Sequence, residues 1–72
     1  MASDFKNFTF IVTLIDNNKL SKVVNMNKRL FDLSNIKQTI LNRARLINQT
    51  KILTKYIEVF GENSILIKKV IL

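Results

Sequence analysis

The chain has 72 residues and a mass of 8.4 kDa, which is enough for one small domain, residues 1–72. Its 12 Lys and Arg against 5 Asp and Glu give a formal charge of +7, and it contains no His, Cys, Pro or Trp. These absences exclude zinc fingers, iron–sulfur centres, disulfide frameworks and catalysis by a thiol or an imidazole.

The positive charge is concentrated in the second half of the sequence. Residues 1–36 carry a net charge of +2, whereas residues 37–72 carry +5. Nine of the twelve basic residues are Lys, and the chain also contains ten Ile and nine Asn, all amino acids with A/T-rich codons. We therefore expect part of the basic character to reflect nucleotide composition rather than a ligand.

The sequence contains no stretch typical of a membrane span or a signal peptide. Its longest apolar stretch, residues 10–15, has the length of a strand, far below the ~18–20 residues of a transmembrane helix. The first six residues lack the basic start and apolar stretch of a secretory signal. We expect a protein of the cytoplasm or of a host cell's cytosol.

The first predicted element is a β-hairpin. Residues 8–15 alternate between two faces and are rich in aromatic and β-branched side chains, which predicts a strand. A three-residue loop, 16–18, followed by a strand over about 19–29 would pair Phe10 with Val24 and keep the apolar side chains on one face. We expect Asn18 to adopt the left-handed conformation in this loop.

A helix is predicted next, from residue 33 to about 48. Asp32 has the character of an N-cap residue, and Phe31 and Ile36 have the spacing of a hydrophobic staple around it. One stripe at helical spacing would face the core, and it consists of Leu33, Ile36, Ile40, Ala44 and Ile47.

Residues 51–60 allow two interpretations. They fit a second helix that ends at Gly61, or a strand that turns back through residues 61–64 into a last strand at 65–72. The predicted fold is therefore α+β, with a small antiparallel or mixed sheet packed on one main helix, in the order ββαββ or ββααβ. The alternation of residues 55–60 favours ββαββ.

The ββαββ order resembles that of ubiquitin-like (β-grasp) domains. The parts that fit are residues 33–40 as the helix and residues 56–61 as the following strand and turn. The chain has no diglycine tail, so the resemblance implies a topology and carries no expectation of conjugation chemistry.

One helix can cover only one face of such a sheet, and the other face is also apolar. Residues 65–72 are apolar on both sides apart from two lysines, a pattern typical of a strand that is covered twice. Monomers rarely expose large apolar patches. We therefore predict an apolar association face made by Ile11, Ile15, Val23, Ile65 and Ile67.

The basic residues of the second half could form one patch, namely Lys37, Arg43, Arg45, Lys51, Lys55, Lys68 and Lys69. Basic side chains beside an apolar face suit an acidic protein partner, because opposite charges speed and orient association. The helix face opposite the predicted core carries amides and Arg45, which are also able to contact base edges in DNA.

Little in the sequence points to catalysis. Asp16 and Asp32 already have turn and cap roles, and Ser21 and Lys22 are strand neighbours that point to opposite faces. A single Gly rules out a glycine-rich phosphate loop. We expect no enzymatic activity, no cofactor and no catalytic or metal site.

The sequence thus predicts a non-enzymatic binding or assembly module. It would associate with an acidic protein partner, with copies of itself, or with both, through its apolar sheet face and its basic surface. The alternative is a small nucleic-acid-binding protein of the type that phages and plasmids encode, since net charge is the first requirement for phosphate contacts.

Overall fold

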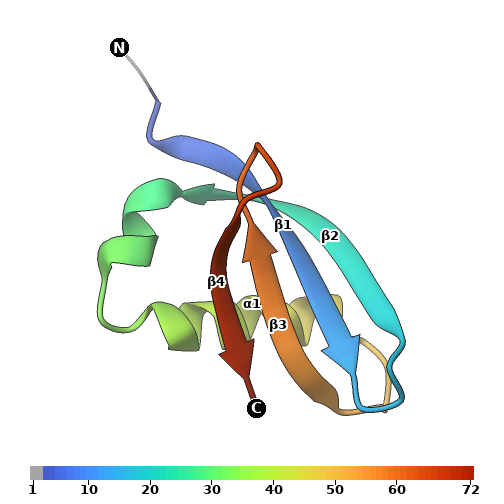
Figure 1. Ribbon diagram of the computed structural model, residues 1–72. Helices are drawn as coiled ribbons and strands as arrows, with labels where there is room; N and C mark the ends of the chain where they lie inside the picture. Colours follow the sequence, from blue (N-terminus) through green and yellow to red (C-terminus); the bar gives the residue numbers. More distant parts are fainter. Residues whose placement is uncertain (1–2) are drawn as a thin grey trace.

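A computed structural model describes residues 3–72 as one four-stranded antiparallel sheet with a single α-helix across one of its faces (Figure 1). The predicted α+β class is confirmed at this level. The elements in chain order are β1 (Phe5–Leu14), β2 (Lys19–Asn27), the 3-10 helix η1 (Lys28–Asp32), α1 (Ile36–Ile47), β3 (Thr54–Phe60) and β4 (Leu66–Ile71).

The strands lie in the order β2-β1-β3-β4, with β1 paired antiparallel to both β2 and β3. The predicted β-grasp-like arrangement is therefore wrong in its strand order. Strand β1 has the most complete apolar alternation, so it is the strand that gains most from a central place. The second hairpin, β3–β4, adds to its free edge. Residues 54–60, for which the sequence allowed helix or strand, form β3.

The core lies between α1 and the helix-side face of the sheet. Phe10, Val12, Ile57 and Val59 are fully buried there, and Ile40 of α1 packs over them. The remaining buried apolar side chains come from β1, β2, β4 and α1, and they are Phe8, Leu14, Met26, Ile36, Ala44 and Val70.

The first hairpin differs from the prediction by one residue in its loop. The Leu14 N–H donates to Asn18 O at 2.8 Å, so the closed loop is 15–17, and Asn17 has the positive φ of 69°. Asn18 instead donates its backbone N–H to Asp16 Oδ1 at 3.1 Å, which stabilises the turn one position earlier. Phe10 is consequently opposite Lys22 and not Val24. Because this shift is two residues along β2, every side chain keeps its predicted face.

The helix also begins later than predicted. Residues 28–32 form η1, whose first N–H groups are satisfied when Asn27 Oδ1 accepts from the Arg29 N–H at 2.9 Å. Asp32 lies inside η1 and caps nothing; the N-cap of α1 is Asn35, which forms no side-chain capping hydrogen bond. Leu33 is therefore outside α1 and half exposed, while Phe31 packs on Phe8 with ring centroids 4.7 Å apart.

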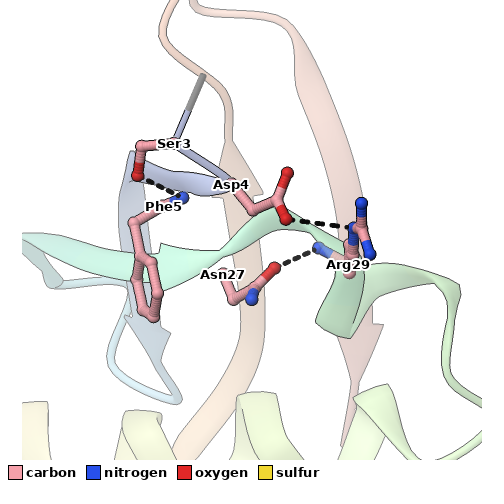
Figure 2. A network of polar contacts seen from close by, with 5 residues as sticks. All are labelled: Ser3, Asp4, Phe5, Asn27 and Arg29. Carbon is pink, nitrogen blue, oxygen red and sulfur yellow. Dashed lines mark hydrogen bonds and ion pairs between the residues drawn. The ribbon is translucent and has the colours of Figure 1, made fainter. Parts of the chain in front are cut away.

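A polar network attaches the start of β1 to η1 (Figure 2). Ser3 Oγ accepts from the Phe5 N–H at 3.1 Å, and the Asp4 carboxylate lies 3.2 Å from Arg29 Nε. The Lys28 N–H donates to Asp4 O at 2.9 Å. The ion pair is solvent-exposed, so we expect it to contribute no more than about 1 kcal/mol. Across residues 3–72 there is no helix of the length and hydropathy that crossing a bilayer requires.

Candidate association surfaces

The sheet has a second face, directed away from α1, which we call the outer face. Strand alternation places Thr9, Ile11 and Thr13 of β1 on it, because their neighbours Phe10 and Val12 point into the core. None of the elements formed by residues 3–72 crosses this face (Figure 1). Its members on the other strands are Lys19, Ser21, Val23, Asn25, Tyr56, Glu58, Phe60, Leu66, Lys69 and Ile71.

Apolar side chains are exposed on the outer face from one edge strand to the other. Val23 on β2 is 61% exposed and Ile71 on β4 is 69% exposed. Between them Ile11 and Phe60 are half-buried and line a shallow hollow of about 230 Å³ together with Thr9 and Ser64. The face therefore offers apolar surface and a concavity into which another side chain can pack.

Two of the five predicted association residues share the outer face, Ile11 and Val23. Ile67 is the extra residue at the register shift of β4, and no residue of β3 lies directly opposite it. Ile15 lies in the loop of the first hairpin, where its N–H donates to Leu53 O at 3.0 Å. Ile65 lies at the opposite end of the sheet, in the loop between β3 and β4. Both are exposed, but they are at the two ends of the face and not on it.

Sequence reasoning missed the aromatic and apolar residues that β3 and β4 add to the outer face, namely Tyr56, Phe60 and Ile71. The alternation of residues 55–60 was the signal that could have found them. It identified a strand without showing which of its faces the helix would cover.

Charge on the outer face is low. The described residues there that carry charge are Lys19, Lys69 and Glu58, and Lys69 Nζ lies 4.5 Å from the centre of the Tyr56 ring. The hydroxyl of Thr13 is the main cause that lowers the pKa of Tyr56. Lys19 and Lys69 lower this pKa further, whereas burial and Glu58 raise it.

The residues of the predicted basic patch do not form one surface. Arg43 lies on the β2 flank of α1, where it lines a hollow with Lys22. Arg45 and Lys51 lie on the opposite flank. Lys69 is on the outer face. Lys37 lies in the first turn of α1, Lys55 lies at the start of β3 beside the loop of the first hairpin, and Lys68 lies on the helix side of β4.

A larger hollow, of about 440 Å³, lies beside α1, next to the first half of β3 and to Leu72. We call it the groove. Leu41, Ala44 and Ile57 form its apolar base, and Arg45 and Lys51 stand at its rim. The remaining lining residues belong to the loop after α1 and to the last residue of the chain: Asn48, Thr50, Ile52, Leu53, Thr54 and Leu72.

Hydrogen bonds from one side chain hold the loop that forms a wall of the groove. Asn48 Nδ2 donates to Ile52 O at 2.9 Å and to Thr54 Oγ1 at 3.0 Å. Its Oδ1 accepts from the Thr50 hydroxyl at 2.6 Å and from the Thr50 N–H at 3.1 Å. The wall is therefore fixed by the fold, so the groove is pre-formed.

Within residues 3–72, no three carboxylates gather into a cluster that could hold a metal ion. Comparison of the chain with models of protein families, with curated proteins and with solved structures gives no significant match.

Proposed function

We propose that this protein is a non-enzymatic assembly module that binds a second copy of itself through the outer face. One observation carries the proposal: the outer face exposes apolar side chains on all four strands, and no other part of residues 3–72 covers them. Burial of apolar surface is worth about 25 cal/mol per Å². Two such faces can stack about 10 Å apart, as sheets do in a β-sandwich.

The low charge of the outer face supports a second copy as its occupant. The chain carries +7 in total, so two copies repel each other at long range. The outer face contributes only Lys19, Lys69 and Glu58 to this charge, and most of the other cations lie on the helix side or in loops. Face-to-face stacking would keep those cations apart and exposed to solvent, where salt screens them.

The arrangement of charge on β3 and β4 also suits a symmetric pair. Glu58 and Lys69 are direct neighbours across these strands. In a two-fold interface each contact between two residues occurs twice, so Glu58 of one copy can meet Lys69 of the other in both directions. Such pairs would fix the register of the two faces more than they would add affinity.

The same distribution of charge disfavours the nucleic-acid alternative for this face. Phosphate contacts need several Lys or Arg directed at one backbone. The outer face has only Lys19 and Lys69 as cations among the described residues, and the carboxylate of Glu58 lies directly beside Lys69. The helix-side cations are divided between two flanks of α1.

The proposal is tested by placing a charge on the outer face. Ile11→Lys and Ile71→Lys should each abolish dimerisation, because stacking of the two faces would then remove an unpaired ammonium group from water. Leu46→Lys is the matched control: Leu46 is 64% exposed, similar to Ile71, but lies on α1. Sedimentation velocity measures the association, and circular dichroism verifies that all three variants remain folded.

Two results would contradict the proposal. One is an unmutated chain that stays monomeric at high concentration yet binds random duplex or single-stranded DNA with an affinity that falls steeply with salt. The other is equal weakening of the dimer by Leu46→Lys and Ile71→Lys, which would show general charge repulsion instead of a specific face.

A further inference from the structure

We propose that the groove beside α1 binds an acidic amphipathic helix from a protein partner. This site lies on the layer opposite the outer face and is independent of the proposed dimer. The groove and the charged residues around it together determine the size, shape and charge of the occupant.

The fold leaves space along one side of α1. Helix α1 runs across the strands and not along them (Figure 1). The groove lies beside it, next to Thr54 and Ile57 of β3 and to Leu72 after β4, which is 59% exposed. A partner helix about 10–12 Å in diameter would lie there beside α1, at the usual 8–10 Å between axes.

The base of the groove is apolar. Ile57 is fully buried and Ala44 nearly so, yet both line the groove, so their side chains form its base. Leu41 is half-buried at one side, and Leu72 stands at the other. A partner helix with apolar residues at positions i, i+3, i+4 and i+7 presents a continuous stripe of the shape that such a groove accepts.

The surroundings of the groove are positively charged. Arg45 and Lys51 stand at the rim, and Lys37 lies two turns before Arg45 on the same flank of α1. Lys68 is on the helix side of β4, opposite Val59. None of the chain's five acidic residues, all within the described part, lines the groove. These cations therefore have no acidic neighbour in the groove, and acidic residues on the flanks of a partner helix would complement them.

The experiment uses a fluorescent peptide of about 18 residues, long enough for a ~27 Å helix, with Leu on one helical face and Glu on its flanks. A control peptide has the same composition in an order that scatters the Leu residues around the helix. We expect fluorescence anisotropy to show binding of the amphipathic peptide and at least about tenfold weaker binding of the scrambled one.

Two double variants of the full chain assign the site. The pair Arg45→Glu and Lys51→Glu should weaken binding of the amphipathic peptide at least about tenfold, because it reverses the charge at the rim. The pair Lys22→Glu and Arg43→Glu makes the same change in charge on the other flank of α1 and should leave the affinity within about twofold. Circular dichroism confirms that both variants keep the fold.

The proposal is overturned if neither peptide binds, if the scrambled peptide binds equally well, or if both double variants lose affinity equally. A single-stranded DNA oligonucleotide that displaces the peptide and binds more tightly would also overturn it, in favour of nucleic acid as the occupant. Because these measurements do not involve the outer face, they can fail while the dimer stands, and the reverse is equally true.

Discussion

Tyr56 is the residue whose ionisation reports most directly on the outer face. Its phenol is partly exposed and lies between the Thr13 hydroxyl and the ammonium group of Lys69. The hydroxyl lowers the pKa of Tyr56 below its usual value of 10.0, and the positive charges act in the same direction. Both effects favour the phenolate.

We predict that Tyr56 of the folded monomer ionises at lower pH than in the unfolded chain. Because the folded pKa is the lower one, ionisation stabilises the native state. This contribution is absent below the folded pKa, grows as pH rises through it, and is complete above the unfolded value. The chain has one Tyr and no Trp, so ultraviolet absorbance of the phenolate measures this residue alone.

Substitution of the neighbouring hydroxyl gives the control for this assignment. Thr13→Val should raise the pKa of Tyr56 toward 10.0, whereas Thr9→Val, on the same face of β1, should leave it unchanged. Equal pKa values in folded and unfolded chains, or equal effects of the two substitutions, would show that Thr13 does not stabilise the phenolate.

At the scale of elements, the segment between β2 and α1 carries an unexpected turn of 3-10 helix. We predict that Asp32→Ala changes the free energy of unfolding by less than about 0.5 kcal/mol, because Asp32 caps no helix in the structure. Asn27→Ala should cost about 1 kcal/mol, since Asn27 Oδ1 accepts from the Arg29 N–H at the start of η1.

Urea unfolding followed by circular dichroism, at one protein concentration, measures both changes. A loss of about 1 kcal/mol for Asp32→Ala would instead match the capping role that the sequence pattern indicated. The same result would mean that α1 begins about three residues earlier than the structure places it.

The elements differ in how far the sequence determines them. Strand β1 was predicted well because its alternation is long and its inward side is uninterrupted. The loop position was missed by one residue because Asn17 and Asn18 both tolerate left-handed backbone, and only the bonds from Asn18 to Asp16 distinguish them. The start of α1 was missed because Asp32 and Asn35 are both reasonable N-caps.

At the scale of the whole molecule, the sequence predicted that one sheet face would lack a cover but could not show where the charges would lie. The predicted patch combined residues near in sequence, whereas helical spacing sends Arg43 and Arg45 to opposite flanks of α1. Lys68 and Lys69 are separated to the two faces of β4 in the same way. Grouping the basic residues by their position in the sequence therefore predicted neither the low charge of the outer face nor the positive rim of the groove.

The proposed stacking of two outer faces would bury apolar residues of all four strands from each copy, and it would leave both grooves free on the outside of the pair. The complex would then be a four-layer particle, helix–sheet–sheet–helix, with two sites for acidic partner helices. The opposite charges of Glu58 and Lys69 offer a way to test the dimer between chains.

The most direct test is sedimentation equilibrium of two charge-reversed variants, alone and mixed. We predict that the unmutated chain has twice the monomer mass of 8.4 kDa, and that Glu58→Lys and Lys69→Glu alone are each monomeric, because like charges then meet across the interface. Mixing the two variants should restore twice that mass, since opposite charges again meet in the heterodimer. An unmutated chain that sediments at 8.4 kDa at every concentration, or a mixture that remains monomeric, would contradict the stacking of outer faces.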